Sequence, residues 1–401
     1  AIRDVDGLAI RSATTVTADL MDAAKNLKVV GRAGIGVDNV DVNAATQRGV
    51  VVMNTPFGNS VTTAEHAIAM MMSLARQLPA ANASTHAGKW EKSAFMGMEL
   101  ASKTLGLVGC GNIGSIVVDR AQGLKMRVIV YDPFLSTEKA ESLSVEKVEF
   151  DELLRRADVI TIHAPLTDGT RSLLGGSAFA KMKDGVRIVN CARGGIIVEA
   201  ELRDAIENGK VAGAAIDVFA EEPATENVLF GMSQIIATPH LGAATSEAQE
   251  NVALQVAEQM SDFLLTGAVS NAINMPSVTA EEAPHLKPYM SLAEKLGSFA
   301  GQLTESGLQT ITIEFQGHVA TLNTRPLIAS AIAGLLRPQL DNINMVNAVS
   351  VARDRGIEIT ETKQEQPGNY EALIRLSVKT ERRVRNLAGT IFGGNRERIV
   401  E

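Results

Sequence analysis

The segment TLGLVGCGNIGSIVVDRAQGLKMRVIVYD, which begins at Thr104, constrains this chain more than any other part of it. A short apolar run leads into Gly109, Gly111 and Gly114. A helical pattern follows, and a second apolar run ends at Asp132. Such glycines are a specific signal only when a strand precedes them, a helix follows them, and an acidic residue comes about twenty positions later. All three conditions are met, so the segment predicts a strand–turn–helix–strand unit that binds a dinucleotide.

Each part of this segment has a physical task in such a unit. Gly109 permits the tight turn, Gly111 allows a pyrophosphate to approach the backbone, and Gly114 lets the helix pack closely on the strand. The helix N-terminus offers unpaired N–H groups and a partial positive charge to the phosphates. Asp132 is placed to bind the ribose hydroxyls of NAD and to repel the additional phosphate of NADP. We therefore expect NAD as the cofactor.

The composition indicates a large α/β protein and argues against several classes of partner. With 401 residues, 45% of them hydrophobic, the chain is too long for one ordinary core, and two or three domains are expected. The net charge of −8 and the lack of a long basic run argue against nucleic acid as a partner. The apolar runs are too short for a membrane span, so no membrane partner is expected. Two cysteines form no disulfide framework, which favours the reducing cytoplasm.

Alternating strand and helix patterns predict how the chain is divided. We expect a Rossmann-type, doubly wound parallel sheet over residues 59–242, inserted in a smaller flavodoxin-like domain made of residues 1–58 and 243–270. Residues 271–284 have the composition of a linker, and residues 285–401 predict a further α+β domain.

Several elements are predicted individually. A helix should begin near Thr17, which is a suitable N-cap, and a longer one should start near Ser60 and end at Pro79. Another long amphipathic helix is expected over residues 245–265. In the last domain, alternation predicts strands in QTITIEFQG and YEALIRLSVKT, and RPLIASAIAGLL predicts a helix.

Three polar residues stand just after three successive predicted strands: Arg193 after VRIVNCA, Glu222 after AIDVFAE and His240 after QIIATP. Because the carboxyl ends of parallel strands open into the ligand crevice, we expect these side chains to converge there. His240 suits the transfer of a hydroxyl proton, and a nearby Glu222 would orient the ring and raise its pKa. Arg193 suits the capture of a carboxylate. Each residue alone is also common at turns or surfaces, but together they predict hydride transfer on a 2-hydroxy acid.

The other histidines predict no further site. His66 lies on a predicted helix and His163 at a strand end, and both fit structural roles. No spacing of His, Cys, Asp and Glu is typical of a metal site, so no metal is expected.

Six motifs between Arg11 and Thr245 together resemble the D-isomer-specific 2-hydroxyacid dehydrogenases. They are GRAGIGVDNVD, NTPFGNS, LVGCGNIG, NCARGGIIVE, AAIDVFAEEP and ATPHLGAAT. The resemblance implies that Arg193, Glu222 and His240 are the catalytic arginine, glutamate and histidine of that family. It further implies that NAD contacts a set of residues at the glycine turn and the strand ends: Asn112, Ile113, Asp132, Ala192 with Arg193, Asp217, and His240 with Gly242 and Ala243.

By the same resemblance, the expected reaction is the NAD-dependent oxidation of D-3-phosphoglycerate to 3-phosphohydroxypyruvate, the first step of serine biosynthesis. A phosphorylated acid needs cations or N–H groups beyond those that hold its carboxylate. The candidates in this sequence are Arg11, Ser12, Arg32, Asn59 and Lys92. The resemblance also implies a homodimer or homotetramer, in which Lys92 would reach the neighbouring subunit's site.

Two alternatives stay open on the sequence alone. One is another member of the family, a glyoxylate, hydroxypyruvate or D-lactate reductase, although such chains usually end before a segment like residues 285–401. The other is an NAD-sensing binding protein similar to the co-repressors built on this fold. The resemblance also implies that a first strand and helix precede Ala1 and that an amino-acid-binding ACT domain follows Glu401, so serine feedback cannot be assigned to this chain.

Overall fold

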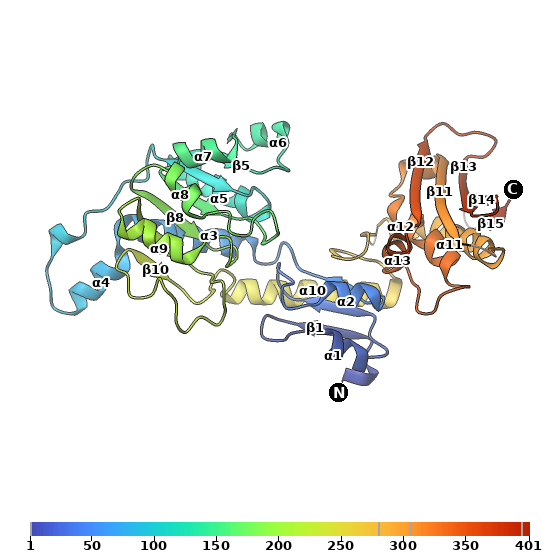
Figure 1. Cartoon of the computed structure of the whole chain (residues 1–401), viewed down its shortest axis with the longest axis horizontal. Helices are drawn as coiled ribbons and strands as arrows, with labels where there is room; N and C mark the ends of the chain where they lie inside the picture. The colour runs from blue at the N-terminus through green and yellow to red at the C-terminus, as the bar shows by residue number, and fades with distance from the viewer. Residues whose placement is uncertain (1, 280, 305–306, 394–395) are drawn as a thin grey trace. The chain divides into compact units, whose positions relative to one another are not determined.

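The computed structural model of the chain describes residues 2–279, 281–304, 307–393 and 396–401 (Figure 1). Ala1 and Ala280, which fall in the predicted first domain and the predicted linker, lie outside the described residues. The chain forms two compact units. We call residues 57–251 the central unit, and residues 1–56 together with 252–401 the flanking unit. Within the described ranges, no helix has the length and apolar character that crossing a membrane requires.

The central unit is built on a seven-stranded sheet of order β10-β9-β8-β7-β4-β5-β6, in which all neighbours are parallel. The chain moves outward from β4 to β6, then returns to place β7 on the other side of β4. Open α/β sheets bind ligands outside the carboxyl ends of their strands at such a reversal. The predicted doubly wound fold is thus confirmed. The strands are β4 (Thr104–Val108), β5 (Arg127–Tyr131), β6 (Glu146–Lys147), β7 (Val159–Ile162), β8 (Val186–Asn190), β9 (Val211–Ile216) and β10 (Ile235–Ala237).

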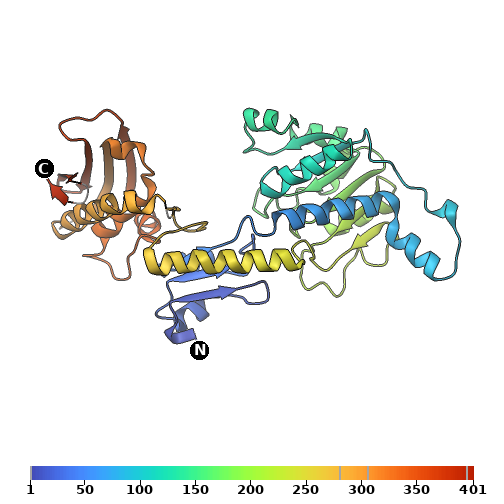
Figure 2. The same ribbon diagram turned by 180° about the vertical axis from the view of Figure 1, so that it is seen from behind.

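Helices cover both faces of this sheet (Figure 2). Alternate residues of a strand point to opposite faces. Leu107 of β4 accordingly packs in one apolar cluster with Val117 of α5, whereas its neighbour Val108 packs in another with Leu153 of α7. The helices are α3 (Ser60–Arg76), α4 (Leu78–His86), α5 (Asn112–Gly123), α6 (Thr137–Ser142), α7 (Phe150–Arg156), α8 (Gly176–Lys181) and α9 (Glu199–Glu207).

The helix predicted to end at Pro79 stops earlier than expected. α3 ends at Arg76, and Gln77 adopts the left-handed conformation with a φ of 52°. Pro79 then lies in the first turn of α4, where its missing N–H leaves no helical hydrogen bond unmade. The prediction was wrong because a proline that stops one helix is equally suited to start the next.

The first part of the flanking unit is a parallel sheet of order β1-β2-β3. Thr17 caps α1 as predicted, since its side chain accepts the N–H of Leu20 at 3.3 Å. Met260 of α10 packs on Val29, and it comes so close to Gly31 that a Cβ there would lie 2.4 Å from the Met260 sulfur. The elements are η1 (Ile2–Asp4), β1 (Gly7–Ile10), α1 (Ala18–Ala23), β2 (Val29–Arg32), α2 (Val42–Gln47), β3 (Val51–Met53) and α10 (Ser246–Thr266).

The second part of the flanking unit is a mixed sheet of order β12-β11-β13-β14-β15 packed with helices, so the expected α+β architecture is present. α12 occupies the residues predicted for it. α11 approaches α12 so closely that a Cβ on Gly297 would lie 2.0 Å from the carbonyl oxygen of Ala331. The elements are α11 (Ala283–Gln302), β11 (Leu308–Gly317), η3 (His318–Thr321), α12 (Arg325–Leu336), α13 (Ala348–Asp354), β12 (Glu358–Gln364), β13 (Ala372–Thr380), β14 (Val384–Phe392) and β15 (Arg396–Ile399).

Candidate functional site

The predicted dinucleotide turn joins β4 to α5 in the central unit. Gly109 has a φ of 90°, which residues with a side chain rarely adopt. A Cβ on Gly114 would lie 2.3 Å from the carbonyl oxygen of Gly109, so the third glycine lets the helix pack on the turn. By contrast, apart from its chain neighbours, no atom of the described residues lies within 4 Å of a Cβ built on Gly111, so the space beside it before α5 is open. The turn therefore fits the pyrophosphate of NAD.

Asp132 holds this turn from the end of β5. Its Oδ2 atom accepts the N–H of Cys110 at 2.7 Å, and its Oδ1 atom accepts the N–H of Phe134 at 2.8 Å. A carboxylate has about four acceptor positions, so others are left for the ribose hydroxyls of a dinucleotide. Asp132 thus has a structural task in the turn in addition to the predicted cofactor contact.

Three loops at the carboxyl ends of β8, β9 and β10 carry the predicted catalytic residues. Asn190 fixes the first loop, because its side chain donates to the carbonyl oxygen of Arg193 and accepts the N–H of Ala192, both at 3.0 Å. The second loop approaches so closely that a Cβ on Gly194 would lie 1.7 Å from the carbonyl oxygen of Phe219. The first two loops are therefore in direct backbone contact.

His240 and Glu222 form a hydrogen-bonded pair between the second and third loops. Nδ1 of His240 lies 2.6 Å from Oε2 of Glu222, whose Oε1 accepts the N–H of Phe219 at 3.0 Å. The histidine side chain is 49% exposed. Since Glu222 engages Nδ1, Nε2 is the ring nitrogen left for a ligand, and no described residue forms a hydrogen bond with it.

Asp217 directly follows β9 and is fully buried. Its Oδ1 atom accepts the N–H of Leu241 at 2.7 Å and the hydroxyl of Thr238 at 2.6 Å, and its Oδ2 atom accepts the N–H of Gly242 at 2.9 Å. Nε2 of His66 lies 3.2 Å from the same Oδ1. The Asp217 carboxylate therefore holds the backbone after the predicted catalytic histidine and the Thr238 side chain before it.

Local charges shift the pKa values of the pair in opposite directions. The hydrogen bond to Glu222 raises the pKa of His240, although burial and the nearby Arg193 guanidinium act to lower it. Burial acts to raise the pKa of Glu222, but hydrogen bonds from His240 and from the Phe219 N–H outweigh it and hold that pKa below its ordinary value. An ionised Glu222 therefore supports a histidine that can carry a proton.

One group of metal-type donors occurs in the part of the chain that the structure describes. Atoms of His66, Cys191 and Asp217 all lie within 4.8 Å of one another. The Asp217 oxygens already accept several hydrogen bonds, and burial raises the pKa of the Cys191 thiol above its ordinary value. Because a metal needs the thiolate, this group fits hydrogen bonding within the protein better than metal binding.

The residues predicted to bind a phosphate fall in both units. Arg11 and Ser12 follow β1, and Arg32 ends the neighbouring strand β2, so these three lie at the same edge of one sheet. Asn59 precedes α3 in the central unit and is buried. Lys92 lies in η2 (Lys92–Ala94), in the exposed segment after α4 that stands off from the central sheet in Figures 1 and 2. That these residues bind the substrate phosphate is a proposal.

Sequence patterns did not reveal several supporting residues. Asn190, Thr238 and His66 come from β8, the end of β10 and α3, and their contacts join segments far apart in the chain. No local spacing signals such contacts. His163 is different, since it is partly buried with its Nε2 2.9 Å from the Thr161 hydroxyl, and burial lowers its pKa to about 4, in keeping with a structural role.

Comparison with known proteins reveals relatives over the full length of this chain. The family described as D-isomer specific 2-hydroxyacid dehydrogenase, NAD binding domain, matches residues 68–242. The family described as D-3-phosphoglycerate dehydrogenase intervening domain matches residues 285–401.

Individual relatives are similarly informative. The D-3-phosphoglycerate dehydrogenase of Archaeoglobus fulgidus is 46% identical over an alignment that covers 100% of this chain and 77% of that protein. The D-3-phosphoglycerate dehydrogenase of Bacillus subtilis is also 46% identical, over 99% of this chain and 76% of that protein. Among solved structures, a glyoxylate reductase from Paecilomyes thermophila is 33% identical, with a TM-score of 0.64 over 68% of this chain and 84% of that chain.

Proposed function

We propose residue roles for a chain that belongs to the D-isomer-specific 2-hydroxyacid dehydrogenases and, within them, to the D-3-phosphoglycerate dehydrogenases. It is an NAD-dependent oxidoreductase that converts D-3-phosphoglycerate to 3-phosphohydroxypyruvate, the first step of serine biosynthesis. The observation that carries this function is the 46% identity to two D-3-phosphoglycerate dehydrogenases over nearly the whole chain. The match of residues 285–401 to the intervening domain supports it against the glyoxylate and D-lactate alternatives.

His240 is the proposed acid and base. In the oxidative direction its neutral Nε2 takes the proton of the substrate hydroxyl, and in the reductive direction the protonated ring returns it. When bound, NAD supplies the acceptor for the hydride. Glu222 holds Nδ1, which fixes the tautomer and stabilises the charged ring after proton transfer. The 2.6 Å contact and the raised pKa of His240 support both roles.

Arg193 is the proposed ligand of the substrate carboxylate. Its planar guanidinium binds a carboxylate bidentately and keeps its charge at any physiological pH. Its loop is fixed by Asn190, which limits the entropy lost on binding. The residues proposed to hold NAD are those of the turn and the strand ends: Gly109, Gly111, Asn112, Ile113, Gly114, Asp132, Ala192, Asp217, Gly242 and Ala243.

The substrate phosphate is assigned to the first-domain cations. Arg11, Ser12 and Arg32 share one sheet edge, and in an open sheet the carboxyl edge is where ligands bind. Asn59 and Lys92 are proposed to add a polar group and a cation from the central unit.

We also propose the predicted domain division, namely residues 1–58 with 243–270, residues 59–242, a linker at 271–284 and a last domain at 285–401. We propose a homodimer or homotetramer, located in the cytoplasm. The large apolar side chains exposed around α4 support the assembly into such an oligomer. Leu78 is 52%, Trp90 86% and Met96 77% exposed, and a second copy would cover them.

The decisive experiment compares NADH oxidation by this chain with 3-phosphohydroxypyruvate and with unphosphorylated hydroxypyruvate. We expect kcat/KM to be about 10²-fold or more higher for the phosphorylated acid, because a site built for a charged group rejects the analogue that lacks it. Equal values would overturn the substrate assignment. Arg32→Ala should raise KM for the phosphorylated acid alone, and Arg3→Ala, an exposed arginine in the same unit, serves as the control.

A further inference from the structure

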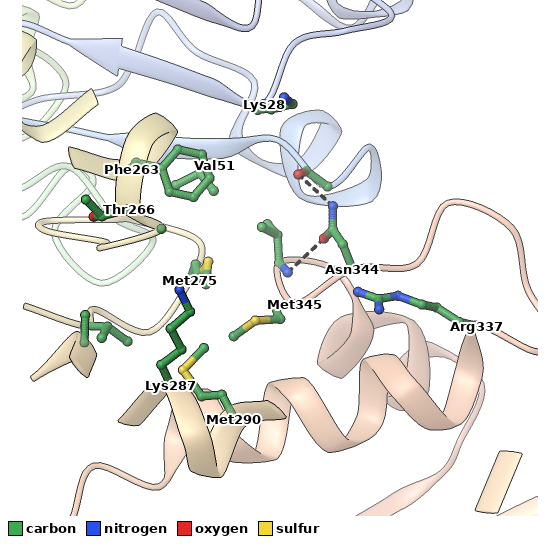
Figure 3. A pocket seen from close by; sticks show the side chains of 15 residues that line it. Lys28, Val51, Phe263, Thr266, Met275, Lys287, Met290, Arg337, Asn344 and Met345 are labelled. Carbon is green, nitrogen blue, oxygen red and sulfur yellow. Dashed lines mark hydrogen bonds between the residues drawn. The ribbon is translucent and has the colours of Figure 1, made fainter. Parts of the chain in front are cut away.

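A cavity lined by none of the proposed dehydrogenase residues lies within the flanking unit (Figure 3). We call it the methionine pocket, because Met275, Met290 and Met345 line it together with Phe263 and Val51. Its volume is about 420 Å³. Pockets that hold small organic ligands measure about 300–1,000 Å³ and are mostly apolar, with a few polar groups that orient the ligand. The methionine pocket has the size and lining of such a site.

One wall of the pocket is fixed by polar contacts. Asn344 donates its side-chain amide to the carbonyl oxygen of Gly49 at 2.9 Å and accepts the N–H of Val346 at 2.9 Å (Figure 3). Gly49 has a φ of 71°, and a Cβ there would lie 1.9 Å from Nδ2 of Asn344. Val346 is buried in the same apolar cluster as Val51. The loop that carries Met345 is therefore tied to the turn at Gly49 by hydrogen bonds.

Three cations and no carboxylates line the methionine pocket. Lys28 pairs with Asp6 at 2.8 Å, and Arg337 pairs with Glu294. Lys287 has neither an ion pair nor a hydrogen bond with any residue that the structure describes. Its side chain rises from α11 toward the pocket in Figure 3. Lys287 is exposed to solvent, so one unpaired positive charge lies at the edge of a mainly apolar cavity.

We propose that the methionine pocket binds a monocarboxylate with an apolar tail. The carboxylate lies on the Lys287 ammonium, and the tail packs among Met275, Met290 and Met345. Methionine side chains are flexible and polarizable, so they adapt to the shape of an alkyl chain. Burial of that tail supplies most of the affinity, and the single charge orients it.

Other classes of ligand fit this lining less well. A sugar phosphate needs several hydrogen-bond donors, whereas the lining is mainly apolar and two of its three cations are already paired. A lipophilic cation would leave Lys287 facing a like charge. A neutral alcohol would fill the apolar space without using the ammonium. These differences make the charge of the ligand the testable part of the proposal.

Binding should also stabilise the flanking unit. The walls come from β3 through Val51, from α10 through Phe263 and from α11 through Met290, so a ligand in the pocket contacts all three elements at once. A ligand that binds only the folded chain raises the unfolding temperature, and the rise grows with the logarithm of the ratio of free ligand to its Kd. No residue that lines the methionine pocket has a proposed role in the dehydrogenase reaction.

The test is calorimetric titration of the 401-residue chain with decanoate, decan-1-ol and decyltrimethylammonium. We expect saturable decanoate binding with a rise in Tm, weaker binding of the alcohol, and no binding of the cation. Lys287→Met keeps the apolar stem and should weaken decanoate at least about tenfold without changing dehydrogenase activity. Lys379→Met, an exposed lysine of β13 outside the pocket, is the control and should bind as wild type does.

A second variant tests the cavity itself. Met345→Trp should fill the pocket and abolish decanoate binding while the unfolding transition of the free chain stays cooperative. The proposal is overturned if decanoate shows no saturable binding, if Lys287→Met binds it as tightly as wild type, if Met345→Trp still binds it, or if decyltrimethylammonium binds equally well.

Discussion

Nδ1 of His240 lies 2.6 Å from Oε2 of Glu222, and this contact determines which ring nitrogen is available to a substrate. The histidine has a φ of 55°, and its N–H donates to the carbonyl oxygen of Asp217 at 2.9 Å. The unusual backbone conformation is therefore held by a buried residue of the protein itself. Because Glu222 holds the ring, His240 does not need to reorient before it transfers a proton.

Replacing Glu222 should change the pH dependence of the reaction. In oxidation the neutral form of His240 is the base, so activity falls as pH drops through its pKa. Glu222 raises that pKa, and Glu222→Gln removes the charge that does so. We expect the acidic limb of the kcat/KM profile to move to lower pH, with kcat reduced about 10²–10⁴-fold because the tautomer is no longer fixed. If the acidic limb stays in place, Glu222 does not raise the pKa of His240.

His240→Ala should abolish most catalysis while leaving cofactor binding intact. Removal of a general acid and base costs about 10²–10⁴-fold in rate, and the proposed NAD contact at this position is only one of many. The measurements are kcat in both directions and the Kd of NADH by fluorescence. Glu226→Ala, which changes an exposed carboxylate in the same region of the chain, is the control and should leave both unchanged. Near-normal turnover of the histidine variant would exclude the proposed role.

The sequence predicted those parts of the site that depend on local pattern. The glycine turn and Asp132 were found because strand, turn and helix follow each other directly in the chain. Arg193, Glu222 and His240 were found because each directly follows a strand of a sheet whose topology places strand ends together. Other contacts of the site were not predicted, since they depend on which strands and helices pack together. They are the hydrogen bonds of Asn190, the contact of His66 with Asp217, and the approach of Gly194 to Phe219.

The errors in the predicted fold have a similar origin. Pro79 was treated as a helix stop because local rules give proline two opposite uses, and only the left-handed Gln77 decides between them. The methionine pocket was not predicted at all. It requires Val51, Phe263 and Met345 to meet, and nearly 300 residues of chain separate the first from the last.

Asp132→Ala should relax the preference for NAD over NADP. The carboxylate repels the 2′-phosphate of NADP, so its removal should lower the ratio of the two kcat/KM values at least about tenfold. The variant should also unfold more easily, by about 1–3 kcal/mol, because the N–H groups of Cys110 and Phe134 lose their acceptor. Asp132→Asn keeps an acceptor oxygen and should recover part of the stability but not the discrimination. If both variants keep the wild-type ratio of kcat/KM values for NAD and NADP, Asp132 does not select the cofactor.

The glycine turn offers a matched pair of substitutions that separates packing from cofactor binding. Apart from its chain neighbours, a methyl group at Gly111 meets no atom of the described part of the chain within 4 Å, so Gly111→Ala should change the unfolding free energy by only about 0.5 kcal/mol. It should nevertheless weaken NADH about tenfold or more, because the methyl group occupies space that the pyrophosphate needs. Gly114→Ala should instead lower the stability of the cofactor-free chain by about 1–3 kcal/mol, since its methyl group would lie 2.3 Å from the Gly109 carbonyl oxygen. Thermal unfolding without cofactor and NADH titration measure the two effects. A Gly111→Ala chain that binds NADH normally would show that the cofactor does not approach the backbone there.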